Sequence, residues 1–398
     1  MNPIQNPYTP GAGTPPSELA GRDELREKVR ICVERLRIGN TAKSVLMVGL
    51  RGVGKTVLLD QMRSDAEATG IHTIRIEVPE SKSLPALLAP ALRVALLRLS
   101  LAENARDLAQ RSLRALAGFA KALKLKFGDI EVGIDFEAEQ GLADNGDLEV
   151  DLTTLFVTAS NAAKAANTVL VIFIDELQYI KQTEFAALIS ALHRCAQLKL
   201  PLTVVGAGLP QLLSLAGEAK SYAERLFDYP IIDKLAPPAA KDAIRKPAQH
   251  LNVDYENAAL EGIIAHTHGY PYFLQEWGKH AWDIAQASPI TALDVERASH
   301  ITIAALDESF FRVRLDRTTP AEKRYLRAMA ELGAGPHRSG DIAQHMNKRA
   351  NSFGPVRKSL ISKGIVWSPI HGDTAFTVPL FHEYLLRTLP TGVPGGTV

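Results

Sequence analysis

Residues 49–56 have the composition and spacing of a loop that binds phosphate. They read G-x-x-x-x-G-K-T, follow the apolar run 45–48 and precede a predicted helix at 55–69. Glycines in such a loop let the backbone approach closely, so that its N–H groups surround a phosphate. Lys55 would neutralise the β- and γ-phosphates, and the Thr56 hydroxyl would face Mg²⁺. The residues expected to contact a nucleotide are Gly49, Gly52, Val53, Gly54, Lys55, Thr56 and Val57.

Two adjacent carboxylates, Asp175 and Glu176, end the apolar run 169–174. An apolar strand that ends in two acids is typical of a Walker B motif. At the carboxyl edge of a parallel sheet, Asp175 would hold Mg²⁺ through water, and Glu176 would activate the water that attacks the γ-phosphate. Lys55 and Glu176 are therefore predicted to be catalytic. The alternative is that the two acids simply end a buried strand.

The elements that must position these residues alternate along the chain. Strands are expected at 45–48, 73–78, 169–174 and 202–205, and helices at 17–38, 55–69, 152–166 and 183–197. The basic segment 83–126 is predicted to form long helices, and the acidic segment 129–151 to contain a hairpin. This alternation predicts an α/β fold with a parallel sheet and helices on both faces.

Composition excludes several classes of protein. The 398 residues include 45 Lys and Arg against 44 Asp and Glu, and 46% are hydrophobic. A disordered chain or a wholly basic coat protein is therefore excluded, and any nucleic-acid surface must be a local patch. The two cysteines, at 32 and 195, lack metal-ligand spacing, and no apolar run approaches the roughly 18 residues that cross a bilayer. We expect a cytoplasmic protein with no membrane segment.

Shifts in composition predict the domain boundaries. We expect an extended arm at 1–17, a nucleotide-binding domain at 18–230 with an insert at about 83–151, a helical lid at 231–317, a winged helix-turn-helix at 318–390 and a tail at 391–398.

With both motifs, the chain resembles the AAA-like P-loop ATPases of the origin-recognition and archaeal-type group, which border on the STAND signalling ATPases. The resemblance implies a P-loop fold, with ATP or ADP as ligand and Mg²⁺ as cofactor. Residues 19–25, Leu-Ala-Gly-Arg-Asp-Glu-Leu, resemble the family's entry motif, which implies that Arg22 lies near the adenine base. The same residues also suit the first turn of a helix, and both roles can hold together.

Three features depart from the origin-recognition pattern or modify it. The strand that usually ends in a polar sensor residue ends in glycines, at 206 and 208, and the arginine expected in the lid is not evident. Residues 268–271, His-Gly-Tyr-Pro, resemble the G-x-P signature of STAND ATPases, which implies that Pro271 contacts the nucleotide and favours a switch over a fast motor. Arg225 resembles the arginine that these families present to a nucleotide, within one chain or across a subunit boundary. The alternative is a surface ion pair with Glu218 or Glu224.

The C-terminal residues form a basic module. Three predicted helices precede a hairpin at 365–378, an order that resembles a winged helix-turn-helix. Between 318 and 398 there are ten Lys or Arg and five Asp or Glu, an excess that favours contact with duplex DNA. The alternative is a rigid spacer or a dimer surface. The candidate DNA-binding residues lie in the third helix and in the turn before it: Lys348, Arg349, Arg357, Lys358 and Lys363.

These observations lead to two hypotheses of function. The first is an ATP-hydrolysing protein that couples nucleotide state to DNA binding through the winged helix. The second is a STAND-like signalling or defence switch that acts through a protein partner, with the winged helix as a spacer. A homo-oligomer is compatible with both.

Overall fold

The computed structural model describes residues 1–124, 137–370 and 372–389 and divides into two compact units. The first unit contains Met1–Gly21, Gly49–Gly54 and Asp233–Val398, and the second contains Arg22–Val48 and Lys55–Ile232. Residues 129–136 of the segment predicted to contain the acidic hairpin lie outside the described residues, and its last residues, 148–151, begin a helix instead.

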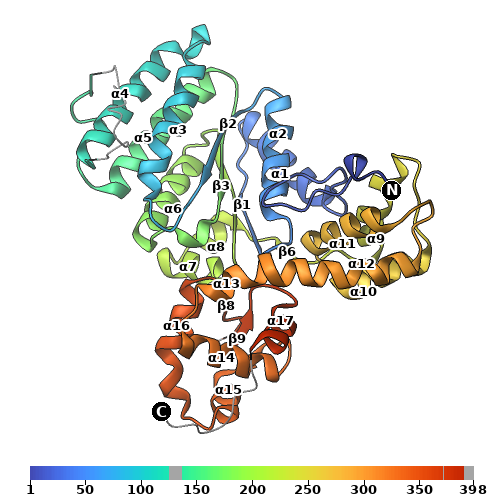
Figure 1. Cartoon of the computed structure of the whole chain (residues 1–398). Helices are drawn as coiled ribbons and strands as arrows, with labels where there is room; N and C mark the ends of the chain where they lie inside the picture. Colours follow the sequence, from blue (N-terminus) through green and yellow to red (C-terminus); the bar gives the residue numbers. More distant parts are fainter. Residues whose placement is uncertain (125–136, 371, 390–398) are drawn as a thin grey trace. The chain divides into compact units, whose positions relative to one another are not determined.

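The second unit is built on a parallel sheet (Figure 1). Its strands run in the order β2-β3-β4-β1-β5, and β6 pairs with β1. All residues of β1, β3 and β4 are buried, which explains their continuous apolar runs, because a parallel sheet is covered on both faces. The strand bounds are β1 (Ser44–Gly49), β2 (His72–Glu77), β3 (Leu170–Asp175), β4 (Leu202–Gly208), β5 (Phe227–Asp228) and β6 (Ile231–Ile232).

Helices cover both faces of this sheet. In Figure 1, α1 and α2 lie on one side of it, and α3 and α6 lie on the other. The predicted α/β fold, with a parallel sheet and helices on both faces, is therefore confirmed. The helix bounds are α1 (Asp23–Arg37), α2 (Lys55–Ala68), α3 (Leu84–Leu99), α4 (Arg106–Ala122), α5 (Leu148–Ala165), α6 (Gln182–Gln197), α7 (Leu212–Ala219) and α8 (Ala223–Leu226).

The first unit is mostly helical and has its own hydrophobic core. Its N-terminal segment contributes Tyr8, which is buried and whose hydroxyl donates a hydrogen bond to the carbonyl of Ile244 (2.5 Å). The ring lies so close to Gly278 that a Cβ there would come within 2.7 Å of it. One aromatic side chain thus anchors a segment whose overall composition predicts an arm without a core.

The elements of the first unit follow in chain order. They are α9 (Pro237–Gln249), α10 (Asn257–Thr267), α11 (Pro271–Ile284), α12 (Ala292–Ala305), the π-helical turn η4 (Leu306–Phe311), α13 (Arg312–Asp316), α14 (Pro320–Glu331), β7 (His337–Arg338), α15 (Ser339–His345), α16 (Gly354–Ser362), β8 (Val366–Trp367), β9 (Asp373–Phe376) and α17 (Phe381–Thr388). Short 3-10 turns complete the described chain at Pro3–Gln5, Glu103–Ala105, Leu177–Tyr179 and Ala350–Phe353.

The C-terminal part of this unit combines helices with a small sheet. Strands β7, β9 and β8 pair in that order and are antiparallel, with Val366 opposite Phe376. The helices and hairpin follow the predicted order along the chain. The assignment of this module as a winged helix-turn-helix stays a prediction.

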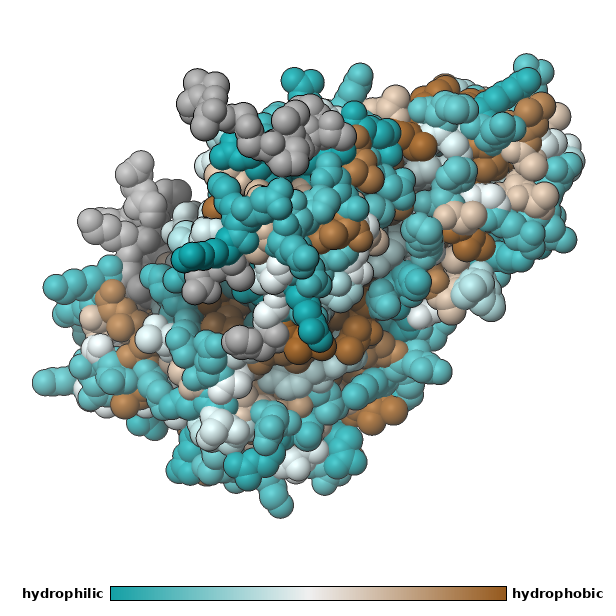
Figure 2. All heavy atoms as spheres, turned by 90° about the horizontal axis from the view of Figure 1, so that it is seen from below, coloured by the Kyte–Doolittle hydropathy of each residue, from teal (hydrophilic) through white to brown (hydrophobic). Residues whose placement is uncertain are grey.

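The surface is predominantly hydrophilic on the face drawn in Figure 2, where hydrophobic residues form separate patches between polar ones. Within the described ranges, no helix has the length and apolar character needed to cross a membrane.

Candidate functional site

The predicted phosphate loop joins β1 to α2, as its sequence context requires. Gly52 and Gly54 adopt φ angles of 81° and 87°, a region in which a side chain is strained. Lys55 is the first residue of α2, and Val53, within the loop, is buried. The two glycines therefore allow the backbone conformation that the motif predicts.

The loop backbone is bonded to two other parts of the first unit. The N–H of Tyr272, the second residue of α11, donates to the Gly52 carbonyl (3.1 Å). The N–H of Arg51 donates to the carbonyl of Thr377, which directly follows β9 (3.1 Å). Since Pro271 starts α11, the G-x-P segment and the loop are brought together within this unit.

An arginine that the sequence did not single out lies beside these residues. The Tyr272 ring stacks on Phe310 at 4.6 Å between centroids, and the Arg314 guanidinium lies 3.8 Å above the Phe310 ring. Burial, together with the nearby positive charge of Arg51, lowers the pKa of Arg314 to about 10. The positive charges of Arg51 and Arg314 are thus close enough to interact.

Three of the predicted residues meet within the second unit. The Thr56 hydroxyl is hydrogen-bonded to the Asp175 carboxylate, and the Glu176 N–H donates to Asp175 Oδ1 (2.9 Å). Burial raises the pKa of Asp175, although both hydrogen bonds oppose this effect. A hydroxyl and a carboxylate held together are hard oxygen donors of the kind that Mg²⁺ prefers, so this donor set fits the expected metal.

Glu176 is held in place by its neighbour Gln178. Its φ is 54°, and the amide nitrogen of Gln178 donates to its carboxylate. Gln178 Oε1 in turn accepts from the Leu209 N–H (3.0 Å), just beyond β4. Gln178 thus ties the candidate catalytic carboxylate to the end of the next strand.

This arrangement explains the glycines at the end of β4. A Cβ at Gly206 would come within 2.3 Å of Leu177 Cδ1, and one at Gly208 within 3.1 Å of Gln178 Oε1. The strand ends in glycines because the turn that carries Gln178 packs directly against it.

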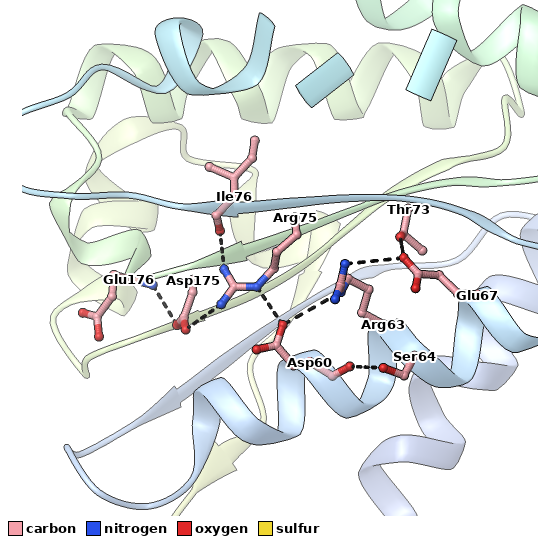
Figure 3. Close-up of polar contacts among 9 residues, drawn as sticks. All are labelled: Asp60, Arg63, Ser64, Glu67, Thr73, Arg75, Ile76, Asp175 and Glu176. Carbon is pink, nitrogen blue, oxygen red and sulfur yellow. Dashed lines mark hydrogen bonds and ion pairs between the residues drawn. The ribbon is translucent and has the colours of Figure 1, made fainter. Parts of the chain in front are cut away.

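A cluster of charged side chains surrounds Asp175 on the side of α2 (Figure 3). Arg75 of β2 lies between Asp175 and Asp60 of α2, and Arg63 lies on the far side of Asp60. Neither Arg75 nor Asp60 is among the site residues predicted from the sequence. Arg75 could have been noticed from the sequence, because it is an arginine between two isoleucines in a strand predicted next to the Walker B strand.

The remaining nucleotide candidates lie on other parts of the two units. Arg22 is half-buried and immediately precedes α1, and Arg225 is exposed on α8. Val57 is half-buried in the first turn of α2, and Gly49 ends β1. Their roles stay predictions.

The five candidate DNA-binding residues divide into two groups. Lys348, Arg349 and Lys358 are exposed, and the first two line a shallow hollow with Gln344, Asn347 and Ser352. Arg357 instead donates to Thr374 Oγ1 (2.8 Å), to Ser368 Oγ (2.7 Å) and to the Asp373 carbonyl (2.7 Å). Its side chain ties α16 to the hairpin.

Lys363 is likewise engaged inside the module. Its Nζ donates to both carboxylate oxygens of Glu322 (2.9 and 2.7 Å), a side chain that is 3% exposed. Burial alone would raise the pKa of Glu322, but hydrogen bonds from Lys363, Ser359 and the Thr319 backbone outweigh it and hold the pKa at about 2. Lys363 therefore stabilises the packing of α16 against α14.

Lys363→Met should destabilise the protein by about 3–5 kcal/mol, because it leaves a buried carboxylate without its partner. Since the folded pKa of Glu322 is depressed, its contribution is present above about pH 4.5 and is lost as the pH falls toward 2. Urea unfolding between pH 7 and pH 3 measures both effects. Lys358→Met, on the exposed face of the same helix, is the control, and an equal loss in both variants would contradict the prediction.

Comparison with known proteins adds the following. Residues 18–205 match the family model of the AAA ATPase domain, and residues 308–385 match that of a domain of unknown function. No curated protein matches the chain by sequence. Among solved structures, a Walker-type ATPase of Pyrococcus abyssi is 14% identical, with 94% of this chain and 97% of that chain covered and a TM-score of 0.60.

Two further structures are more distant in shape. The Orc1 protein of Aeropyrum pernix, solved in complex with DNA, is 15% identical with a TM-score of 0.47, and 94% of each chain is covered. The RuvB Holliday junction branch migration motor of Thermotoga maritima is 18% identical with a TM-score of 0.44, covering 95% of this chain and 100% of that chain. At 14% identity, the Pyrococcus structure supports a similarity of fold and of nothing more.

Proposed function

We propose that this chain, in which residues 18–205 match the AAA ATPase domain, hydrolyses ATP and couples its nucleotide state to duplex DNA through its C-terminal module. The observation that carries the proposal is the meeting of Thr56, Asp175 and Glu176 at the end of β3. A hydroxyl, a buried carboxylate and a second carboxylate at the edge of a parallel sheet are the groups that phosphoryl transfer to water needs.

The residues divide the chemistry between them. Lys55 and the loop N–H groups would bind the phosphates, and Thr56 and Asp175 would hold Mg²⁺, which supplies charge neutralisation when bound. Glu176 would orient the attacking water and take up its proton. Arg225, exposed on α8, would reach a nucleotide from its own chain or from a neighbouring copy.

The contacts of the phosphate loop support the coupling. Its backbone is bonded to α11 through Tyr272 and to the C-terminal module through Thr377. A loop that adjusts around a phosphate would shift both partners, because a hydrogen bond weakens steeply as its geometry departs from linearity. Nucleotide binding could therefore be transmitted to the module through the loop backbone itself.

Removal of three exposed charges tests whether the C-terminal module binds duplex DNA. In Lys348→Gln/Arg349→Gln/Lys358→Gln, the affinity for duplex DNA should fall, and the slope of log K against log salt should decrease by about 2–3, roughly one per lost phosphate contact. Basal ATP hydrolysis should be unchanged, whereas its stimulation by DNA should be lost. Fluorescence anisotropy at several salt concentrations and steady-state hydrolysis measure these effects.

The control removes three exposed lysines from the second unit, in Lys164→Gln/Lys181→Gln/Lys199→Gln. An equal loss of DNA affinity in both variants would attribute binding to net charge and would contradict a DNA site in the module.

A nucleotide-gated switch that acts through a protein partner is the second candidate. Arg357 and Lys363 favour it, because both side chains stabilise the module rather than extend from it. Slow turnover that DNA does not change would identify this function. We propose a cytoplasmic location for either function.

A further inference from the structure

Strand β2 places a charged side chain where its neighbours are apolar. Arg75 lies between Ile74 and Ile76, which are both 3% exposed, and its own side chain is 21% exposed. Strands β2 and β3 pair in parallel with Glu77 opposite Asp175. This register lets Arg75, two residues earlier, reach along the sheet to the carboxylate that ends β3 (Figure 3).

The guanidinium of Arg75 is fixed by three acceptors. Its Nε donates to Asp60 Oδ1 (2.8 Å), and Nη1 donates to the Ile76 carbonyl (2.8 Å). Its Nη2 faces Asp175 Oδ2 at 3.5 Å. A guanidinium keeps its charge at all accessible pH values and presents its donors in a rigid plane. Arg75 therefore holds a permanent positive charge in one position beside Asp175.

Asp175 needs such a charge when no metal is bound. Its side chain is 3% exposed, and its contacts with the Thr56 hydroxyl and the Glu176 N–H are with neutral donors. The positive charge of Arg75 forms an ion pair with it at 3.5 Å. A buried carboxylate without a counter-ion is strongly unfavourable.

We propose that Arg75 is the resident counter-ion of Asp175 and sets the Mg²⁺ concentration at which the nucleotide site fills. This inference rests on the proposed function, in which Asp175 helps to hold the metal. The cation that stabilises the empty carboxylate also repels an incoming divalent ion. Because Arg75 is bonded to Asp60 and to its own strand, it cannot turn away without losing those bonds. Arg75 is thus a positioning residue that acts through Asp175.

Arg63 provides a matched control within the same cluster. Its Nε lies 3.9 Å from Asp60 Oδ1 and its Nη1 lies 3.5 Å from Glu67, but it forms no ion pair with Asp175 among the described residues. Figure 3 shows it on the far side of Asp60. Arg63→Gln therefore removes the same charge from the same helix–strand cluster without uncovering Asp175.

The experiment titrates free Mg²⁺ into wild type, Arg75→Gln, Arg75→Lys and Arg63→Gln, with a fluorescent ATP analogue as the probe. Arg75→Gln should reach half-saturation at about threefold to tenfold less Mg²⁺, because the substitution removes one unit of positive charge beside the metal position. Arg75→Lys, which keeps the charge, and Arg63→Gln should stay within about twofold of wild type. In an Asp175→Asn background, Arg75→Gln should have no further effect.

A thermal measurement tests the counter-ion without nucleotide. In metal-free buffer Arg75→Gln should unfold several degrees below Arg63→Gln, and Arg75→Lys should recover most of the loss. If Arg75→Gln needs as much Mg²⁺ as wild type or more, Arg75 does not set the Mg²⁺ concentration at which the site fills. If Arg75→Gln and Arg63→Gln are equally stable to heat, Arg75 is not the counter-ion of Asp175. If wild type binds no nucleotide at any Mg²⁺ concentration, both the proposed function and the proposed effect of Arg75 on Mg²⁺ binding fail. The thermal comparison still decides whether Arg75 is the counter-ion.

Discussion

Lys55→Ala should bind ATP about 100-fold more weakly than wild type, or not measurably. Loss of one partner of a desolvated charge pair costs roughly 2–5 kcal/mol, and Lys55 is the residue that the loop places at the phosphates. The left-handed glycines at 52 and 54 hold the loop backbone, so the substitution removes the charge while the loop geometry remains. Isothermal titration calorimetry with ATP and Mg²⁺ measures the affinity.

Lys43→Ala is the control for this prediction. Lys43 immediately precedes β1, whereas Lys55 lies beyond the other end of that strand. The Nζ of Lys43 lies 3.9 Å from an oxygen of Asp228. It should bind ATP as wild type does. Retained ATP affinity in Lys55→Ala would remove the phosphate-loop assignment and with it the proposed function.

Glu176→Gln should abolish hydrolysis while ATP still binds. An amide cannot take a proton from the attacking water, and general base catalysis contributes about 10²–10⁴-fold to a rate. We therefore expect kcat to fall by at least about 100-fold with little change in ATP affinity. Single-turnover hydrolysis and equilibrium binding, measured on the same preparation, separate the two effects.

Glu224→Gln is the matched control, because Glu224 is exposed on α8. Its turnover should equal that of wild type. If Glu176→Gln hydrolysed ATP at the wild-type rate in a single turnover, another group would act as the base. That result would refute the assigned role of Glu176.

The local sequence was sufficient for the sheet, its covering helices and the two motifs. The apolar runs at 45–48 and 169–174 predict buried parallel strands, because such strands have both faces covered. Glycines at 52 and 54 predict a backbone that only glycine adopts without strain, and the φ angles agree. These features depend on periodicity and on backbone sterics, which neighbouring residues alone determine.

The partners of individual side chains were decided by tertiary structure. Lys363 had the charge and helix position of a DNA contact, yet it is bonded to Glu322, 41 residues away. Gln178 bonds to Glu176 and to Leu209, which is 31 residues away. Arg75 meets Asp175 across 100 residues through the register of β2 on β3.

The physical reason is the same in each case. A polar side chain on a partly buried surface has several possible partners, and its burial demands that one of them be met. Which one is met depends on strand register and helix packing, which bring distant residues together. The sequence alone therefore determined which chemical groups are available for nucleotide chemistry, and the fold decided which of them face Asp175 and which hold the C-terminal module together.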